Sequence, residues 1–272
     1  MPERLDVRKT YKLYLGGEFV RSESGRAFQP EAGVNVPLAS RKDVRDAVKA
    51  ARGAFAGWSG RTAMNRGQVL YRAAEMLDGR RAQFISVLGG GRRAGREVDT
   101  AVEALVWYAG WTDKLSQAAG SVNPVSGPYF NFTIPEPTGV VGIVGRDLPA
   151  LAGLTLAIAP ALAGGNTVVA IASETRPLAA LTLGEVFATS DFPAGVVNIL
   201  AGRRAELVPW LAAHMDVNAI DAGGCPGELL VEVRETASVN VKRVIARQGQ
   251  ELTLQAITDL MEMKTVWHPV GV

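Results

Sequence analysis

The chain has 272 residues, of which 47% are hydrophobic and 21% charged. This composition is enough for a sizeable core without disulfides or structural metal ions, and it excludes a disordered or collagen-like chain. The 29 Lys and Arg residues nearly balance the 27 Asp and Glu residues, and the net charge of +2 gives no reason to expect a nucleic acid or an acidic membrane as partner. One Cys and two His residues provide neither an internal disulfide nor a zinc-binding set, so we expect no metal site.

Residues 1–19 alternate charged and apolar side chains and contain no continuous apolar stretch of the kind found in secretory signals. No run of about 18 apolar residues is free of Gly, Pro or charge anywhere in the sequence. The sequence therefore predicts neither a signal peptide nor a transmembrane helix. We expect the protein in the cytoplasm.

The first third of the chain is predicted to be helical after a short hairpin. The extended pieces YKLYL and EFV flank Gly16 and Gly17, which is typical of a hairpin turn. A helix is predicted to follow Ser40, because Ser40 and Asp43 occupy the positions of a capping box and the next apolar residues have helical spacing. Further helices are predicted over 63–77, 80–88 and 95–119. The run GGGRRAG at 89–95 lacks the GK[ST] of a P-loop, so we expect a solvated loop there.

Strands and helices alternate in the second half of the chain. The strand-like segments are GVVGIVG (139–145), NTVVAIAS (166–173), GVVNILAG (195–202), VNAIDAG (217–223) and VKRVIARQ (241–248), with helices expected at about 149–163, 177–188 and 207–213 and another after residue 223. Parallel strands are buried on both faces and are joined by helical crossovers, so apolar strands alternating with helices predict an α/β fold with a doubly wound parallel sheet.

Two further segments are rich in β-formers and lie outside this alternation. A Pro- and Gly-rich turn precedes Tyr129, Phe130, Phe132 and Ile134, which predicts an exposed hairpin over 122–134. A second extended segment is predicted at 261–270, near the end of the chain.

The order of these segments resembles the cofactor domain of an aldehyde dehydrogenase. The resemblance is carried by PTGVVGIVGRDLPALAGLTLAIAPALAGGNTVVAIASETRP (137–177), FPAGVVNILAG (192–202) and TASVNVKRV (236–244), with FAGWSGRTAMNRGQVLYRAAEML (55–77) similar to the family's N-terminal arm and LMEMKTVWHPVGV (260–272) similar to its C-terminal strand. It implies a Rossmann-like doubly wound sheet with an N-terminal helical arm and a small β oligomerisation flap. Residues 1–121 and 136–251 would form the degenerate NAD(P)-binding domain, and 122–135 with 260–272 the flap.

Members of this family oxidise aldehydes through a Cys thiohemiacetal, pass hydride to NAD(P) and hydrolyse the thioester with a water activated by Glu. No segment of these 272 residues resembles the Cys-bearing domain. The single Cys225 lies in GGCPG, beyond a strand of the cofactor domain, and neither His214 nor His268 is a sequence neighbour suited to activating it. We therefore assign no catalytic residue.

Several positions that the resemblance aligns with functional residues carry other side chains. Asp147 stands where the family has an oxyanion-donating Asn, and an ionised carboxylate only accepts hydrogen bonds. Ile171 replaces a Lys that meets the adenosine ribose. Arg204 and Val208 replace two glycines at a helix N-terminus, where their side chains would take the space of the phosphates. Arg247 falls at about the general-base Glu, and a guanidinium cannot accept a proton at neutral pH.

The remaining cofactor positions are interpreted as vestigial: Val144, Gly145, Glu174, which matches the family's ribose-facing acid, and Arg204. We expect NAD(P) to bind weakly or not at all.

Near its full length, the chain resembles the C-terminal half of family-16-type, two-module aldehyde dehydrogenases. It shares with them RKDVRDAV (41–48), VLYR (69–72) and WHPVG (267–271). The resemblance implies a non-catalytic subunit that associates through its flap with a complete aldehyde dehydrogenase. Two alternatives stay open: an NAD(P)-binding oxidoreductase acting on aldehydes with residual activity, and a homodimer that stores or senses nucleotide.

Overall fold

A seven-stranded sheet forms the centre of the computed structural model, which describes residues 9–31, 33–247, 249 and 251–271. Its strand order is β11-β10-β7-β8-β9-β1-β2. The strands are β1 (Leu13–Leu15), β2 (Glu18–Val20), β7 (Val140–Val144), β8 (Thr167–Ile171), β9 (Val197–Leu200), β10 (Ala219–Asp221) and β11 (Arg243–Ile245). Strands β7 to β11 are parallel, and the N-terminal hairpin adds antiparallel to β9. The predicted α/β fold with a parallel sheet is confirmed.

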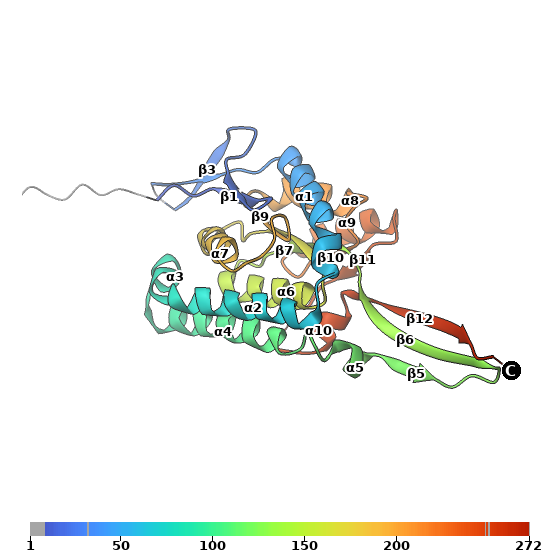
Figure 1. The fold of residues 1–272 in the computed structure, drawn as a ribbon. Coiled ribbons are helices and arrows are strands. Elements are labelled where there is room, and N and C mark those ends of the chain that lie inside the picture. Colours follow the sequence, from blue (N-terminus) through green and yellow to red (C-terminus); the bar gives the residue numbers. More distant parts are fainter. Residues whose placement is uncertain (1–8, 32, 248, 250, 272) are drawn as a thin grey trace, which may run out of the picture.

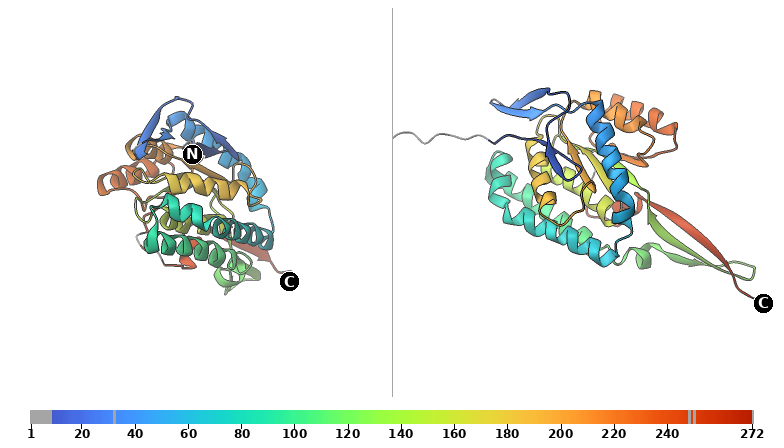
Figure 2. Two further views of the ribbon diagram at one scale, coloured as in Figure 1. Left: turned by 90° about the vertical axis from the view of Figure 1, so that its left-hand side faces the viewer. Right: turned by 45° about the horizontal axis from the view of Figure 1, so that its top comes forward.

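Helices cover both faces of this sheet (Figures 1 and 2). Helices α1 (Arg41–Ser59), α8 (Arg204–Ala213) and α9 (Gly227–Ser238) lie on one face, and α6 (Ala150–Ala163) and α7 (Leu178–Ala188) on the other. Helices α2 (Ala63–Gly79) and α4 (Gly91–Ala109) pack outside α6, and α3 (Arg81–Val87) packs on α4 and α7. Every residue of β7 and β8 is buried between these layers, which explains why both strands are apolar except for Thr167 at the start of β8.

Helix α1 begins where the sequence predicts. The Ser40 side chain accepts a hydrogen bond from the Lys42 amide, and the Asp43 carboxylate accepts one from the Ser40 amide at 2.7 Å. This capping box satisfies amides that have no partner inside the helix. Asp43 also accepts a 2.7 Å hydrogen bond from the Ser22 hydroxyl, which joins the start of α1 to the segment after the N-terminal hairpin.

A three-stranded sheet projects from the side of the α/β body (Figure 1). We call it the projecting sheet; it consists of β5 (Ser121–Asn123), β6 (Tyr129–Pro137) and β12 (Met261–Pro269), in the order β12-β6-β5. The predicted hairpin and the predicted terminal strand therefore pair with each other across the length of the chain. Short helices α5 (Leu115–Ala119) and α10 (Gln255–Thr258) precede β5 and β12.

The structure corrects the sequence prediction in three places. The helix predicted over 95–119 ends at Ala109, because the Thr112 hydroxyl donates a hydrogen bond to the Ala109 carbonyl and the chain turns before α5. The run 89–95 is not a loop throughout, since α4 starts at Gly91, the last of three consecutive glycines with positive φ. The small antiparallel pair β3 (Ala27–Glu31) and β4 (Val34–Pro37) was not predicted. None of the described helices is long and apolar enough to cross a membrane.

Candidate functional site

Ligands of doubly wound proteins bind at the carboxyl ends of the parallel strands, at the point where the strand order reverses. Here that point is β7, which pairs with β8 on one side and with β10 on the other. Of the residues that the sequence assigns to a cofactor or to catalysis, Val144 and Ile171 lie in strands, and Arg204 and Val208 lie in α8, which begins at Arg204. The others lie in the loops that leave β7, β8, β10 and β11. We therefore describe this edge of the sheet as the candidate site.

A partly buried ion pair connects the loop after β7 to the start of α8. The guanidinium of Arg204 donates two hydrogen bonds to the Asp147 carboxylate, Nη1 to Oδ2 at 2.8 Å and Nη2 to Oδ1 at 2.7 Å. Nη2 also donates to the Gly145 carbonyl at 2.8 Å. The Arg204 side chain is only 12% exposed, so its charge is directed inward rather than to solvent. Such a two-point pair is among the strongest hydrogen-bonded contacts that side chains make.

Asp147 is held ionised by its surroundings. Burial by itself would raise the pKa of this carboxyl, but the hydrogen bonds from Arg204 and Ser173 and the charge of Arg204 outweigh burial and hold the pKa well below its usual range. The Thr175 amide donates a further, longer hydrogen bond at 3.3 Å. In this setting Asp147 acts only as a hydrogen-bond acceptor, as expected of an ionised carboxylate.

Glu174 lies in the loop after β8 and binds the N-terminus of α8. Its Oε2 accepts a 2.9 Å hydrogen bond from the backbone amide of Arg204, and its Oε1 accepts one from Arg203 Nη1 at 3.1 Å. A carboxylate is stabilised at a helix N-terminus by the unpaired amides and the helix dipole. A phosphate arriving at this helix terminus would have to displace Glu174.

A second helix N-terminus at this edge is occupied in the same way. The Glu97 carboxylate of α4 accepts hydrogen bonds from the amides of Leu151, at 2.7 Å, and Ala152, at 3.4 Å, in the first turn of α6. The protein thus supplies its own carboxylates to the helices that follow both β7 and β9.

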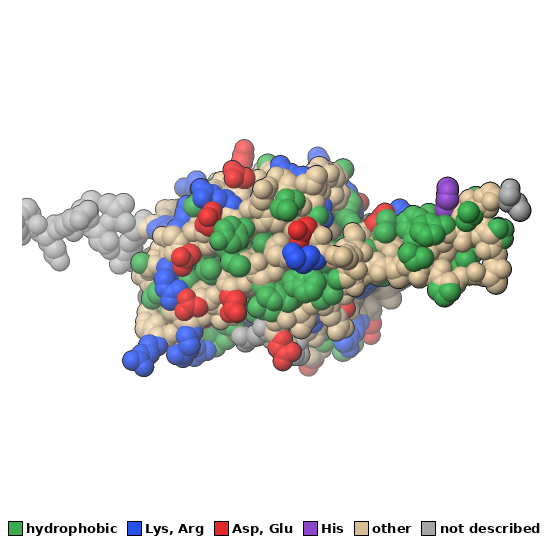
Figure 3. All heavy atoms as spheres, turned by 60° about the horizontal axis from the view of Figure 1, so that its bottom comes forward, with side chains coloured by type: hydrophobic (Ala, Val, Ile, Leu, Met, Phe, Trp, Pro, Cys, Tyr) green, Lys and Arg blue, Asp and Glu red, His purple; other side chains and the backbone are tan. Residues whose placement is uncertain are grey.

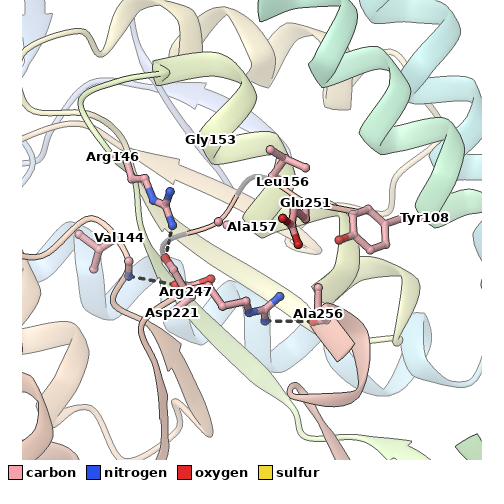
Figure 4. A pocket seen from close by; sticks show the side chains of 12 residues that line it. Tyr108, Val144, Arg146, Gly153, Leu156, Ala157, Asp221, Arg247, Glu251 and Ala256 are labelled. Atoms are coloured by element: carbon pink, nitrogen blue, oxygen red, sulfur yellow. Dashed lines mark hydrogen bonds between the residues drawn. The ribbon is translucent and has the colours of Figure 1, made fainter. Parts of the chain in front are cut away.

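A small cavity lies beside the ion pair, at the ends of β7, β10 and β11 (Figure 4). Tyr108, Arg146, Asp221, Arg247 and Glu251 contribute its polar side chains, and its volume is about 40 Å³. That volume holds a few water molecules and is far below the several hundred Å³ of a typical ligand pocket.

Arginines and one buried carboxyl shape the chemistry of this cavity. Arg146 donates a hydrogen bond to the Arg247 carbonyl, and Arg247 donates to the Ala256 carbonyl at 3.0 Å. Burial raises the pKa of Asp221, which the Gly223 amide and the charges of the two arginines partly offset. Arg247, at about the position of the general-base Glu, serves here as a donor to the backbone.

Cys225 is half-buried close to this cluster, and its surroundings on balance disfavour the thiolate. Burial raises the pKa of its thiol to about 11, although the charge of Arg204 acts in the opposite direction. His214 follows α8 at the end of the helix opposite Arg204, and His268 lies in β12 of the projecting sheet. Neither can act as a base toward Cys225 in this arrangement.

The structure brings together the four residues assigned to vestigial cofactor binding. Val144 ends β7, Gly145 and Glu174 both contact Arg204, and the Gly145 amide donates to the Ile171 carbonyl at 2.7 Å. One of the substituted positions, Val208, does not lie where the sequence predicts. Ile171 is fully buried at the end of β8, and Val208 is fully buried in the core, so the Val208 side chain does not fill the space in front of α8. Only Arg204 does so.

Sequence reasoning missed the pairing of Asp147 with Arg204 and the role of Glu97. The ion pair could have been predicted, because Asp147 and Arg204 carry opposite charges and follow two strands of the same parallel sheet. The role of Glu97 could not, because Glu97 is an ordinary helix residue in the sequence. Among the described residues no group of three or more His, Cys, Asp or Glu side chains could hold a metal ion.

Comparison with known proteins identifies the family. The family model described as "Aldehyde dehydrogenase family" matches residues 22–255. The chain is 34% identical over 258 residues to the putative aldehyde dehydrogenase DhaS of Bacillus subtilis, covering 89% of this chain and 51% of that protein. It is 36% identical over 263 residues to retinal dehydrogenase 2 of Mus musculus, covering 90% and 49%. The chain belongs to the aldehyde dehydrogenase family.

A solved structure agrees with this assignment. The NAD⁺ complex of an aldehyde dehydrogenase from Bacillus cereus superimposes with a TM-score of 0.77 at 28% identity, over 87% of this chain and 50% of that one. The chain spans about half the length of the curated relatives it matches. The family is thereby established.

Proposed function

We propose that this chain is a non-catalytic subunit of the aldehyde dehydrogenase family that associates, through its projecting sheet, with a complete aldehyde dehydrogenase. The observation that carries the proposal is the free edge of β12. In the order β12-β6-β5 this nine-residue strand is outermost, and no described strand pairs with its outer side. An exposed edge strand is a template for strand pairing, and soluble proteins normally cover or pair such edges.

The apolar face of the projecting sheet supports the same proposal. Side chains alternate along a strand, so Phe130, Phe132 and Ile134 share one face, and Val122 and Val266 both lie opposite Phe132. Val122 is 68% exposed and Phe130 47%. Hydrophobic side chains accordingly gather on the projecting sheet in the space-filling view (Figure 3). A partner sheet that adds to β12 would extend the backbone ladder and cover this face. We expect the complex to bury well over about 2,000 Å², as obligate assemblies do.

Lack of catalysis is inferred from the candidate site. Asp147 accepts hydrogen bonds and repels a developing oxyanion, and the Cys225 thiol stays protonated at neutral pH because burial raises its pKa to about 11. Arg247 cannot act as a general base. For the same site we propose weak or absent NAD(P) binding, since Arg204 and Glu174 hold the N-terminus of α8.

Association is tested by deleting residues 264–272 from the chain. Mixed with a complete aldehyde dehydrogenase of the same organism, the intact chain should co-elute with the enzyme in size-exclusion chromatography with light scattering. The deleted variant should keep its circular dichroism spectrum and elute alone. A deleted variant that still co-elutes, or an intact chain that forms only a homodimer and ignores every complete aldehyde dehydrogenase of its cell, contradicts the proposal.

A pair of point variants locates the contact. Val122 in β5 and Met215 after α8 have almost the same exposed fraction, 68% and 67%. Val122→Asp should weaken association by at least about tenfold, because a partner covering the apolar face would bury the new carboxylate, and Met215→Asp should leave the affinity unchanged. Equal effects of the two substitutions would show that the apolar face is not the contact.

The catalytic and cofactor parts have their own measurements. We expect the purified chain to show no NAD(P)-dependent aldehyde oxidation and no esterase activity; thiol-dependent turnover abolished by Cys225→Ala would contradict this. Calorimetry should give no NAD dissociation constant as tight as about 10 μM, which corresponds to roughly 7 kcal/mol of binding.

An NAD(P)-binding oxidoreductase with residual activity on aldehydes is the second candidate function. The similarity to NAD⁺-bound aldehyde dehydrogenases and the retained parallel sheet favour it. The same calorimetry separates it from the first candidate. A cytoplasmic location and a nucleotide-storing homodimer remain predictions, the latter tested by the elution volume of the chain alone.

A further inference from the structure

At the carboxyl edge of the sheet, carboxylates of the same chain accept hydrogen bonds from the first backbone amides of two helices. Glu97 binds the first amides of α6, and Glu174 binds the amide of Arg204 at the start of α8. Helix N-termini at this edge are the positions where an anionic ligand is ordinarily held. Two such positions are therefore occupied by residues distant in sequence from the helices they bind.

The charged residues at the N-terminus of α8 are linked to one another by a series of contacts. Arg203 pairs with Glu174 Oε1 at 3.1 Å, Glu174 Oε2 accepts from the Arg204 amide, and the Arg204 guanidinium makes its two-point contact with Asp147. Ser173, fully buried next to Glu174, donates its hydroxyl to Asp147 at 2.8 Å. The loop after β7, the loop after β8 and the start of α8 are thus tied together by five side chains, those of Asp147, Ser173, Glu174, Arg203 and Arg204.

We infer that Asp147, Glu174 and Arg204 form an internal clamp that takes the place of an anionic ligand at the N-terminus of α8. Asp147 and Arg204 are then one coupled feature rather than two independent substitutions. Each is the main charged partner of the other at this edge, so removal of either leaves the other's charge unpaired and partly buried, which costs free energy. A phosphate could enter only by displacing Glu174 and passing the Arg204 side chain.

This inference deepens the cofactor part of the proposed function and rests on it. It is separable from the association part, because the clamp lies at the edge of the central sheet and the free edge of β12 lies in the projecting sheet. A failure to associate, with the clamp intact, would contradict only the proposed association. A negative result in the clamp experiments would contradict only the clamp.

The coupling is measured by a double-mutant cycle in the full chain. Asp147→Asn, Arg204→Gln and the double variant are unfolded with urea beside the parent chain. We expect the double variant to lose no more stability than the worse single variant, because both single changes break the same contact. Additive losses would overturn the clamp.

An exposed ion pair at the same helix provides the control cycle. Arg26 and Glu206 lie 2.9 Å apart with side chains that are 48% and 47% exposed, and Glu206 belongs to the first turn of α8. Arg26→Gln and Glu206→Gln should show a smaller coupling than the clamp pair, since solvent screens an exposed pair. Equal coupling in the two cycles also counts against a special role for Arg204 and Asp147.

Opening the clamp should restore anion binding. The variant combining Asp147→Asn, Glu174→Gln and Arg204→Gly removes the displacing carboxylate and the blocking side chain but keeps Arg203 beside the helix N-terminus. Calorimetry with inorganic pyrophosphate should show binding at least about tenfold tighter in this variant than in the parent chain, for which we expect a dissociation constant weaker than about 1 mM.

Each outcome decides the inference. Tighter pyrophosphate binding by the opened variant, together with a non-additive cycle, supports the clamp. A folded opened variant that binds no better than the parent, or a parent that already binds as tightly, overturns it. If the triple variant fails to fold, the cycle on the two milder substitutions decides alone.

Discussion

The central sheet and the projecting sheet are both built from β-branched and aromatic residues, yet they bury those residues to very different extents. All five residues of β7 and of β8 are buried between two helical layers. In β12, seven of the nine residues are exposed, one is half-buried and one is buried. Stability of this chain therefore resides in the α/β body, and the projecting sheet has apolar surface left for another molecule.

Two tryptophans express the same contrast in a single residue type. Trp58 in α1 has no exposed surface, and its indole N–H donates to the Leu162 carbonyl at 3.3 Å. Trp267 in β12 is 59% exposed and contacts Tyr129 edge to face, with ring centroids 5.7 Å apart. The first is a core residue, and the second is available to a partner.

The largest effect should come from exchanging these two tryptophans for alanine. Trp58→Ala should lower the free energy of unfolding by about 3–5 kcal/mol, because it opens a cavity in the core. Trp267→Ala should change it by no more than about 0.5 kcal/mol and instead weaken association with the partner. Urea unfolding and light scattering measure the two effects. A similar loss of stability in both variants would show that the projecting sheet is part of the folding core.

Lys242 is a buried charged residue of the α/β body. The residue is 7% exposed just before β11, and its Nζ donates to two neutral oxygens, the His214 carbonyl and Asn240 Oδ1. Burial lowers the pKa of Lys242 from its usual 10.5 to about 8. The folded chain therefore releases this proton at lower pH than the unfolded chain, and stability should rise with pH between about 8 and 10.5.

Lys242→Met should remove that rise. Urea unfolding of parent and variant at pH 7 and near pH 10 gives the difference directly, and other titrating groups cancel between the two proteins. The parent should gain stability relative to Lys242→Met as the pH increases. A difference that stays constant over this range would mean that Lys242 keeps its ordinary pKa in the folded chain.

A smaller effect is expected at the start of α1. Ser40→Ala removes the side-chain acceptor of the capping box and should cost about 1 kcal/mol of stability. Ser59→Ala, at the other end of the same helix, is the control, since its hydroxyl makes only a long 3.4 Å contact with the Ala56 carbonyl. Equal melting temperatures for the two variants would contradict a role of the capping box in the fold.

The smallest effect is expected for the ion pair on the projecting sheet. Lys264 Nζ lies 3.0 Å from Glu136 Oε2, diagonally across β12 and β6, and the two side chains are 59% and 41% exposed. Lys264→Ala should lower stability by no more than about 1 kcal/mol, because solvent screens the pair. Thermal unfolding at low and high salt checks this; a larger, salt-independent loss would mean that the pair is not solvated as its exposure indicates.

Much of the fold was predictable because its signals are local. The Gly16-Gly17 turn, the capping box of Ser40 and Asp43, and the alternation of apolar strands with helices each depend on residues a few positions apart. The end of α4 was not predicted, because it depends on the hydrogen bond that the buried Thr112 hydroxyl donates to the Ala109 carbonyl. A helical apolar pattern continues through that point, so the sequence pattern favours the longer helix.

The candidate site was predictable as a set of positions and not as a set of contacts. Asp147 and Arg204 were identified as unusual residues, but they are 57 positions apart in the sequence. They follow β7 and β9, which are separated by β8 in the sheet. Their pairing requires the order of the parallel strands and the direction of the Arg204 side chain. Val208 shows the reverse case, since its place in a helix was correct but its burial in the core was not foreseen.

The sequence by itself determined the α/β class, the order of its strands and helices, and the chemical types of side chain that stand at the family's functional positions. Only the tertiary structure decided which distant segments meet. Arg204 binds Asp147, Glu174 and Glu97 bind helix N-termini, and 129–137 pairs with 261–269 in the projecting sheet. The physical reason is that periodicity and capping act over a few residues, whereas ion pairs and strand pairing depend on how distant segments are brought together when the core is buried.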